Sequence, residues 1–494
     1  MAVLMMLHPG LPFFLFAAIV FGVLCHCAHL RIHPTHKATT YKLSKQHHDR
    51  FTHHDHASRT THPNRFNTIV VGLAQWAAPL PTISPAAASV LGLEKYDIPH
   101  DQGSYQGYTR IIRMPYYEHP PMSCCSSASY ELWYEIEREA GQKLLHITGS
   151  LDIGPADSWV FKGALRSAME YELAHEVLTG LELAQRYPGY QLPHEIMALY
   201  QPDGGFLTPE GCVVSYCFEA LKQGAELHGR EGVTHWEALP GGEGVRVYTE
   251  KAIYEADSLV ITAGAWNDEI LGFLRGLAVP ELQVLAWFQP ERPEYFTSAT
   301  FPVFNLLVDE GRYYGFPVHG VPGFKIGKYH HLEERGHPDQ LRREVMDLDE
   351  AILRDCVARY FPTAGGPLLT LKSCMFTNAP DGHFLIDLHP EYPQVSYASA
   401  CSGHGFKFGS VIGEILADLA QYRQTRHNIE LFTHNRFQGQ STHGFSGEHG
   451  NLVPIYETAV RHHAKREQQH SAPFTSHQSP VTSRNSERAL RFTA

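Results

Sequence analysis

The chain has 494 residues, a net charge of −12 and an isoelectric point near 6.3. This length favours two domains with additional tails, and the acidic balance excludes a nucleic-acid-binding protein, which would need a basic surface. Nine cysteines stand at irregular spacing, without sets of paired CxxC motifs. They predict neither a disulfide framework nor a metal site, and they favour a reducing compartment.

Both ends of the chain are predicted to lie outside the folded protein. Residues 11–24 are nearly all apolar, but no Lys or Arg precedes them and they are short for a membrane span. Residues 26–65 hold ten of the 33 histidines, without periodicity. We expect residues 1–65 to be a disordered leader, and a membrane anchor or signal at 11–24 stays open as an alternative. Residues 438–494 are predicted to be a second disordered tail.

Two short apolar runs open a predicted parallel sheet. Residues 66–72, FNTIVVG, are β-branched and end in glycine, and residues 90–94, VLGLE, end in an acid. Glu94 lies 22 residues after Gly72, the spacing at which a dinucleotide-binding fold places a carboxylate on the ribose hydroxyls. We therefore predict a Rossmann-type nucleotide site with Gly72 at the first turn and Glu94 after the second strand.

Further elements follow along the chain. Helical spacing of apolar residues is found at 209–225 and 408–423, and strand patterns are found at 244–248, 258–262 and 282–328. The strand at 258–262 continues into AGAWN, where Gly264 would allow close packing on a pyrophosphate. The runs at 282–328 predict an antiparallel sheet that covers the cofactor, and the helix at 408–423 would point its N-terminus at the same ligand.

The first turn departs from the GxGxxG pattern. It has Gly72, Ala74 and Ala77, and Pro79, Pro81 and Pro85 follow where the first crossover helix belongs. Each interior proline costs a helix about 3 kcal/mol. Residues 74–89, back-translated and read one base earlier, permit GAMGSAA and restore GLGAMG followed by an alanine-rich helix of the same length. Residues 121–129 (PMSCCSSAS) permit an aliphatic-rich helix under the same shift, although less closely. We interpret both segments as products of compensated frameshifts.

Five motifs occur in a fixed order. They are GSYQGYTRIIR at 103–113, YYGFP at 313–317, GFKIG at 323–327, CMFTNAPDGHFLID at 374–387 and SGHGFK at 402–407. Together they resemble the sarcosine oxidase and N-methyltryptophan oxidase family of FAD-dependent enzymes over about residues 66–437. The resemblance implies an α/β fold, with a Rossmann-type FAD-binding domain interleaved with a substrate domain on a mixed or antiparallel sheet.

The resemblance also implies domain boundaries and a reaction. We place the FAD-binding domain at 66–146, 205–277 and 370–437, and the substrate domain at 147–204 and 278–369. The implied enzyme oxidises a secondary amine, with sarcosine or another N-methyl amino acid as substrate, and yields amine, aldehyde and hydrogen peroxide. Pipecolate, saccharopine-like and fructosyl amino acids stay open as substrates. A flavin dehydrogenase and a catalytically impaired homologue with a broken FAD loop are the alternative functions.

The location implied by the resemblance is intracellular, either cytoplasmic or peroxisomal. The last residues, 491–494, do not form the SKL signal of peroxisomal proteins. The expected partners are the small amine substrate and O2.

The resemblance assigns the redox chemistry to three side chains. Cys374 corresponds to the covalent attachment point of the flavin, and Lys372 could help to lower the pKa of its thiol. Lys325 corresponds to the lysine that activates oxygen, because a fixed cation stabilises the negative charge that develops on O2. Arg110 corresponds to an arginine that faces the flavin.

The substrate residues are assigned in the same way. Arg113 and Lys407 would clamp the substrate carboxylate, and Tyr314 would form part of the aromatic wall around the methylamine. His330 and His404 fall at family positions near the site. The family commonly has a histidine in the loop before TRIIR, where this chain has Tyr105 and Gln106, so the substrate preference is left open. The predicted cofactor-binding residues are Gly72, Ala74, Ala77, Glu94, Arg110, Gly264, Cys374, Gly403, His404, Gly405, Phe406 and Lys407.

Overall fold

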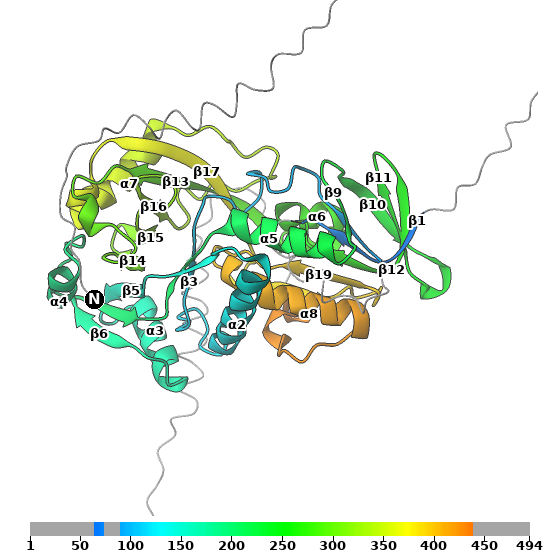
Figure 1. Ribbon diagram of the computed structural model, residues 1–494, viewed down its shortest axis with the longest axis horizontal. Helices are drawn as coiled ribbons and strands as arrows, with labels where there is room; N and C mark the ends of the chain where they lie inside the picture. Colours follow the sequence, from blue (N-terminus) through cyan, green and yellow to red (C-terminus); the bar gives the residue numbers. More distant parts are fainter. Residues whose placement is uncertain (1–63, 74–88, 438–494) are drawn as a thin grey trace, which may run out of the picture. The chain divides into compact units, whose positions relative to one another are not determined.

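The structure of this protein is a computed structural model that describes residues 64–73 and 89–437 (Figure 1). The predictions for the leader, the tail, Ala74 and Ala77 lie outside the described residues. All described residues belong to one compact unit of the chain. Among them, no helix combines the length and the apolar character needed to cross a bilayer.

The first sheet has a parallel core in the order β9–β2–β1–β12–β19. These strands are β1 (Asn64–Val71), β2 (Val90–Leu93), β9 (Glu226–His228), β12 (Ile253–Ile261) and β19 (Val395–Ser399). Three antiparallel strands extend it, namely β10 (Val233–Ala238), β11 (Val245–Thr249) and β18 (Leu385–Leu388). The predicted strands at 66–72, 90–94, 244–248 and 258–262 are therefore confirmed.

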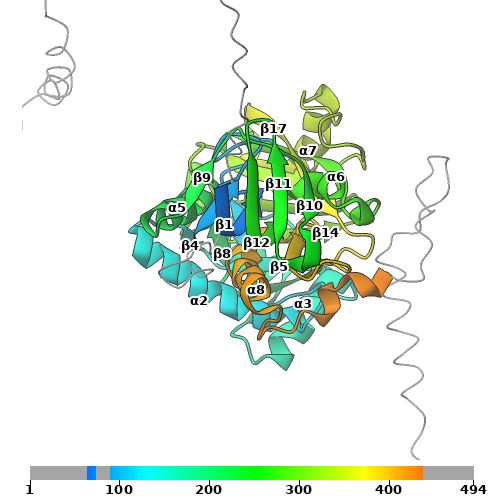
Figure 2. The same ribbon diagram turned by 90° about the vertical axis from the view of Figure 1, so that its right-hand side faces the viewer.

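The parallel core is buried on both faces, which explains its continuous apolar runs. Successive side chains of a strand point to opposite faces. Val70 accordingly packs in the cluster that contains helix α8 (Gly409–Tyr422), while Ile69 and Val71 pack in the cluster on the other face. Helix α8 packs against β12 and β19, and Figure 2 shows it next to β12. The predicted helices at 408–423 and 209–225 are both confirmed, the second as α5 (Pro209–Lys222).

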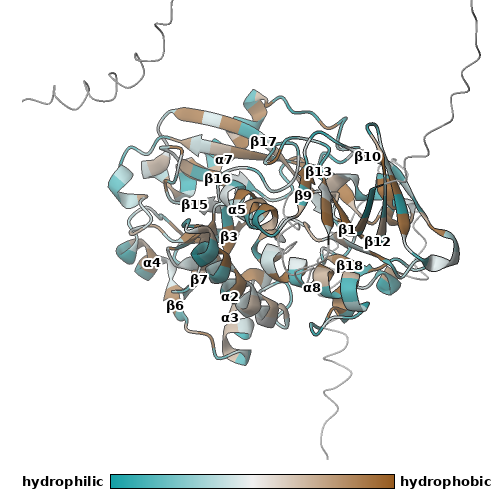
Figure 3. Cartoon of the chain, turned by 45° about the vertical axis from the view of Figure 1, so that its right-hand side comes forward, coloured by the Kyte–Doolittle hydropathy of each residue, from teal (hydrophilic) through white to brown (hydrophobic). Residues whose placement is uncertain are grey.

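The second sheet is mixed and has the order β17–β13–β16–β15–β14–β5–β7–β6. Its strands are β5 (Ser150–Pro155), β6 (Glu176–Thr179), β7 (Ile196–Gln201), β13 (Val279–Phe288), β14 (Val303–Val308), β15 (Gly311–Phe316), β16 (Phe324–Lys328) and β17 (Leu368–Asn378). Every pair is antiparallel except β14 with β5. The antiparallel sheet predicted at 282–328 is confirmed. The long strands β13 and β17 are largely hydrophobic (Figure 3).

Strand β17 corrects one predicted boundary. The sequence placed residues 370–437 in the FAD-binding domain, but β17 pairs along its length with β13 in the second sheet. Residues up to Asn378 therefore belong to that sheet, because backbone pairing with β13 decides where the strand lies.

A small third sheet and several helices complete the fold. The sheet has the order β3–β8–β4, formed by β3 (Arg110–Ile112), β8 (Gly205–Leu207) and β4 (Leu145–Ile147). The other helices are α2 (Met122–Ala140), α3 (Trp159–Glu170), α4 (Gly180–Arg186), α6 (Asn267–Ile270) and α7 (Asp347–Tyr360). Strand β3 carries the TRIIR motif, so this sheet fixes the two arginines of that motif relative to the rest of the site.

The start of helix α2 coincides with the second segment interpreted as frame-shifted. Its first turns bury Ser123, Ser126 and Ser129. Within the described part of the chain, the hydroxyls of Ser123 and Ser129 have no hydrogen-bond partner, whereas Ser126 donates to the carbonyl of Met122 at 3.3 Å. A buried unpaired hydroxyl costs about 1–3 kcal/mol, which an aliphatic side chain would not. The frameshift interpretation stays a prediction, and these serines are consistent with it.

Candidate active site

The carboxyl ends of β1, β2 and β12 border a cavity that contains the predicted nucleotide-binding residues. Gly72, Glu94 and Gly264 all line it. Gly72 has φ +88°, and a Cβ there would lie 2.5 Å from the carbonyl oxygen of Thr262. Only glycine satisfies this turn, because an L side chain would be strained and would also clash. Ligands of open α/β sheets bind at this edge of the strands.

Glu94 is buried at the end of the second strand, as predicted. Its carboxylate accepts hydrogen bonds from the backbone N–H of Leu73 at 2.9 Å and of Tyr96 at 3.0 Å. His100 lies 3.5 Å away through its Nε2. The two backbone bonds hold the carboxylate at the first turn, where it faces the same cavity as Gly72 and Gly264.

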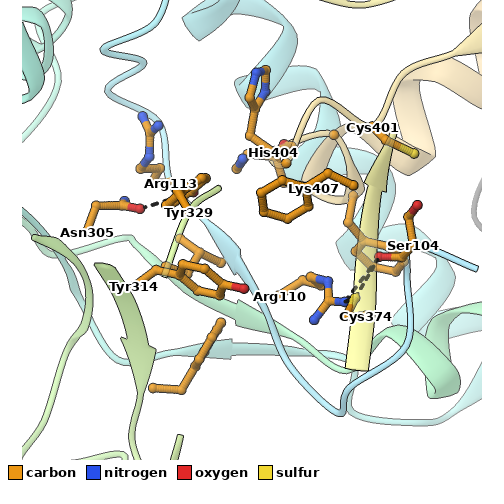
Figure 4. Close-up of a pocket in the computed structure, with 16 residues that line it drawn as sticks. Ser104, Arg110, Arg113, Asn305, Tyr314, Tyr329, Cys374, Cys401, His404 and Lys407 are labelled. Carbon is orange, nitrogen blue, oxygen red and sulfur yellow. Dashed lines mark hydrogen bonds between the residues drawn. The ribbon is translucent and has the colours of Figure 1, made fainter. Parts of the chain in front are cut away.

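A second cavity contains nine of the predicted residues (Figure 4). They are Arg110, Arg113, Tyr314, Cys374, Gly403, His404, Gly405, Phe406 and Lys407. Ser104 and Cys401 line both cavities. The two cavities therefore adjoin, and together they provide an elongated site that begins at the parallel sheet and ends among aromatic and basic side chains.

Cys374 is buried on β17, with its thiol directed at Arg110 (Figure 4). The guanidinium of Arg110 donates to Sγ of Cys374 at 3.4 Å. Lys372 instead donates to the hydroxyl of Tyr108 at 3.2 Å. The sequence assigned the cation beside the thiol to Lys372, but the structure assigns it to Arg110, which reaches Cys374 from a segment 264 residues away. A thiolate is stabilised by such a neighbour.

Lys325 is buried on β16, facing opposite to Phe324 and Ile326 as the alternation of a strand requires. Its Nζ donates to the carbonyl oxygens of Gly107 at 2.6 Å and Thr109 at 2.9 Å, and to the hydroxyl of Thr109 at 2.9 Å. Three acceptors match the three N–H groups of an ammonium. Burial, and then the charge of Arg110, lower the pKa of Lys325 well below its usual value. This lowered pKa favours the neutral amine, and the three acceptors fix the position of Nζ.

Arg113 is buried in a cluster of charged and aromatic groups. It donates to the carboxylate of Glu118 at 2.6 Å, and its Nε lies 3.7 Å from Asp152. Its guanidinium also lies 3.8 Å from the ring centre of Tyr117. Burial raises the pKa of Glu118, but Arg113, then His404 and Lys407, outweigh it and lower that pKa to about 2. Glu118 is therefore ionised and balances the charge of Arg113 in the absence of another anion.

Lys407 and His404 lie on the turn before α8. Nζ of Lys407 donates to the carbonyl of His404 at 2.6 Å, and burial, followed by the charge of Arg113, lowers the pKa of Lys407 to about 7. His404 lies between the hydroxyl of Tyr116 and the carbonyl of Gly382, and burial lowers its pKa to about 3. His404 is thus neutral and positions the turn, whereas Lys407 offers a charge that changes near neutral pH.

The glycines of this turn permit a close approach of the backbone. Gly403 has φ +73°, and a Cβ there would lie 2.8 Å from the ring of Phe376. A Cβ on Gly405 would lie 1.5 Å from the carbonyl oxygen of Ala400. Phe406 stacks on Trp133 with ring centres 6.0 Å apart. The SGHGFK motif therefore encodes a tight turn that brings its backbone and Lys407 to the cavity.

The aromatic wall contains Tyr314, as predicted, together with Tyr329, which the sequence did not single out. Their ring centres lie 4.9 Å apart. His330 does not line this cavity. It is paired with the buried carboxylate of Glu281 at 2.7 Å and lies on a separate surface cavity beyond Tyr329. The turn after β16 presents Tyr329 to the cavity and leaves His330 outside its lining, and the catalytic role of His330 stays a prediction.

Three further polar residues were missed. Glu118, Asp152 and Asn305 are buried around Arg113 and the aromatic wall. The available signal was a polar residue within an apolar strand, as in SLDIGP at 150–155 and FPVFNLLV at 301–308. Tyr105 and Gln106, where the family commonly has histidine, are both engaged. Tyr105 accepts from the N–H of His100 at 2.6 Å, and Gln106 donates to the carbonyl of Ser373 at 2.6 Å.

Comparison with known proteins decides the family. A profile of the FAD dependent oxidoreductase family matches residues 82–419. Monomeric sarcosine oxidase from Bacillus sp. (strain NS-129) is 37% identical over 380 residues, which cover 75% of this chain and 97% of that protein. The chain belongs to the FAD dependent oxidoreductase family. The predicted family, fold class and dependence on FAD are confirmed.

Other similar proteins support the same family. Monomeric sarcosine oxidase from Streptomyces avermitilis is 38% identical over 378 residues, covering 75% of this chain and 97% of that protein. N-methyl-L-tryptophan oxidase from Yersinia pestis (strain Pestoides F) is 30% identical over 359 residues, covering 72% and 94%. The open form of NikD, an unusual amino acid oxidase, has a similar fold, with a TM-score of 0.65 and 22% identity over 75% of this chain and 97% of that one.

The residues of this FAD-dependent oxidoreductase fit its cofactor. The cavity at Gly72, Glu94 and Gly264 has the glycine turn and the carboxylate that a dinucleotide requires. It adjoins the cavity of Cys374 and Arg110 through Ser104 and Cys401. A long ligand could therefore lie with its phosphates at the parallel sheet and its ring system at the basic, aromatic cavity.

Proposed function

We propose that this protein oxidises sarcosine or another N-methyl amino acid with O2, using FAD attached covalently through Cys374. Oxidation of the C–H bond beside the nitrogen yields an imine, which water splits into an amine and an aldehyde, while O2 is reduced to hydrogen peroxide. FAD, when bound, supplies the acceptor for the two electrons. The remaining work of binding and orientation falls to the residues of the two cavities.

The observation that carries this proposal is a pair of buried cations, Arg113 and Lys407, in the same cavity as Cys374 and an aromatic wall. Two buried cations suit a carboxylate, since a charge-assisted hydrogen bond is shorter and stronger than a neutral one. Tyr314 and the neighbouring rings exclude water and provide a surface for a methylamine. Burial raises the pKa of Tyr314, so its phenol stays neutral.

The other residues have distinct roles in this proposal. Cys374 would form the bond to the flavin, and Arg110 would stabilise the thiolate that this bond requires. Lys325 lies outside the lining of the cavity and is held beside Arg110 by the loop at 107–109. It would stabilise negative charge on oxygen as O2 is reduced.

The attachment is tested by precipitating the purified protein with acid. We expect yellow colour to stay with the pellet of the parental protein and to appear in the supernatant of Cys374→Ala. Cys356→Ala, which changes a buried thiol of helix α7 that lines neither cavity, is the matched control and should keep its flavin. Fully extractable flavin in an active parental protein would refute the covalent bond.

The reaction is tested by supplying sarcosine, N-methyl-L-tryptophan, glycine and pipecolate under air and measuring oxygen uptake and peroxide. Oxidation of an N-methyl amino acid with stoichiometric peroxide is expected. Flavin reduction by the substrate without peroxide would instead indicate a dehydrogenase that uses another acceptor. A flavin-containing protein that none of these amines reduces would contradict the proposed function.

A further inference from the structure

One end of the substrate cavity is polar, although aromatic rings surround it. Asn305 lies on β14 and is 2% exposed, with its side chain at the cavity. Its chain neighbours Phe304 and Leu306 point into the apolar core on the other face of the sheet. Figure 4 shows Asn305 beside Tyr329 and Arg113, at the opposite end of the cavity from Cys374 and Cys401.

The orientation of the Asn305 amide is fixed by its neighbours. Its Nδ2 donates to the carboxylate of Asp152 at 2.9 Å, and its Oδ1 accepts from the hydroxyl of Tyr329 at 3.4 Å. Asp152 stands directly beside Asn305 in the parallel pairing of β5 with β14. An amide has two N–H donors and two acceptor lone pairs. Among residues 64–73 and 89–437, these two bonds use half of that capacity, which leaves one N–H and one lone pair for a ligand.

In the proposed function, different side chains of the cavity contact different parts of the substrate. The carboxylate belongs to Arg113 and Lys407, and the reacting C–H bond belongs at the end of Cys374 and Arg110. Asn305 lies beside Arg113 and at the opposite end from Cys374, so it faces the groups next to the substrate carboxylate, which include whatever the substrate carries on its α-carbon. A hydroxyl or a carboxamide both donates and accepts, as the free half of the amide requires. An acidic side chain would only accept, and it would meet the carboxylate of Asp152 behind the amide.

We propose that Asn305 determines specificity by selecting N-methyl amino acids whose side chain carries a hydroxyl or carboxamide over those with an apolar side chain. This inference rests on the proposed function, because it concerns the substrate of the same cavity. An apolar side chain at this place would remove water from the amide without replacing its hydrogen bonds. A site built to hydrogen-bond a substrate discriminates strongly against analogues that lack the group.

The test compares kcat/KM for N-methyl-L-serine, N-methyl-L-alanine and sarcosine in the parental protein and in Asn305→Leu, which keeps the volume and removes the amide. We expect the parental protein to favour the serine derivative over the alanine derivative at least tenfold, mainly through KM. In Asn305→Leu this ratio should fall to about one or below. Sarcosine has no side chain, so its kcat/KM in Asn305→Leu reports how far the change also disturbs the neighbouring Asp152 and Arg113.

The outcomes separate this inference from the proposed function. A parental ratio near one overturns the role of Asn305, and so does a ratio that Asn305→Leu leaves unchanged. Rates are expressed per bound flavin, so incomplete loading does not alter the ratio. If Asn305→Leu loses its flavin, the ratio measured in the parental protein still tests whether the cavity prefers a hydroxyl-bearing side chain. A parental protein that oxidises none of the three compounds contradicts the proposed function itself.

Discussion

The affinity for a carboxylate should fall as the pH rises through about 7, because the charge of Lys407 is lost there. Burial, followed by the nearby charge of Arg113, lowers the pKa of Lys407 from 10.5 to about 7. Below that pKa the side chain is an ammonium and attracts a carboxylate, and above it the side chain is a neutral amine. Bound anion stabilises the ammonium, so the pKa of Lys407 should be higher in the complex.

The size of the effect follows from two limits. The ammonium fraction falls from one half at the pKa to about one per cent two pH units above it, which would weaken binding about 50-fold. The loss stops when the whole contact is gone, and a charge-assisted hydrogen bond is worth about 2 kcal/mol, or roughly 30-fold. We therefore expect binding to weaken by roughly ten- to 30-fold between pH 7 and 9.

Other titratable groups around Lys407 determine how carboxylate affinity depends on pH below 7. Burial raises the pKa of Asp152 to about 6, although Arg113 and Asn305 oppose this. Ionisation of Asp152 adds a negative charge and so weakens anion binding in a separate step at lower pH, near its pKa. The pKa of Glu118 is lowered to about 2 and that of His404 to about 3, so neither changes its charge between pH 5 and 9.

The assay is a titration with acetate or another carboxylate that has no amine. Binding is monitored through the change in flavin absorbance, and the titration is repeated at several values between pH 5 and 9. Lys407→Met should remove the upper step and keep the lower one. A dissociation constant that is flat from pH 6.5 to 9 would refute the role of Lys407. The same profile in Lys407→Met would assign the upper step to another group.

Three further changes have expected outcomes. Lys325→Met should slow the reoxidation of reduced flavin by O2, because this step places negative charge on oxygen that a cation stabilises. Anaerobic reduction by substrate should stay nearly unchanged, and stopped-flow absorbance measures both rates. Ser129→Ala should raise the free energy of unfolding by about 1 kcal/mol in urea denaturation, because it removes a buried hydroxyl that has no partner among the described residues. Replacing residues 74–89 by the restored-frame sequence should raise the flavin content severalfold, since Ala74 stands where the GxGxxG pattern has its second glycine and three prolines follow where the pattern expects a helix.

Each of these expectations has an outcome that contradicts it. Lys325→Met that reoxidises at the parental rate would exclude the role of Lys325. For helix α2, Ser127→Ala is the control, because the hydroxyl of Ser127 donates to the carbonyl of Ser123 at 3.3 Å and both variants gain the same helix propensity. Equal stabilities of the two variants would show that the Ser129 hydroxyl is not destabilising. Equal, near-stoichiometric flavin with either version of 74–89 would reject the frameshift interpretation.

The sequence by itself determined the elements that depend on local pattern. The β-branched runs at 66–72 and 90–94 form adjacent parallel strands, because a strand buried on both faces needs a continuous apolar run. Gly72 was identifiable since only glycine satisfies its backbone conformation. The ordered motifs identified the family, and that resemblance named nine residues that the structure brings to one cavity. These features require only neighbouring residues, whose spacing is visible in the chain.

The tertiary structure alone decided which distant groups meet. Asp152 and Asn305 are 153 residues apart, and only the pairing of β5 with β14 places them side by side. Arg110, rather than the nearby Lys372, reaches Cys374 because β3 and β17 converge on the cavity. The pKa of Lys407 likewise depends on burial and on Arg113, which no spacing reveals. Strand alternation tells which face a side chain takes, but the partner on that face, and so the charge of the site, follows from how the sheets pack.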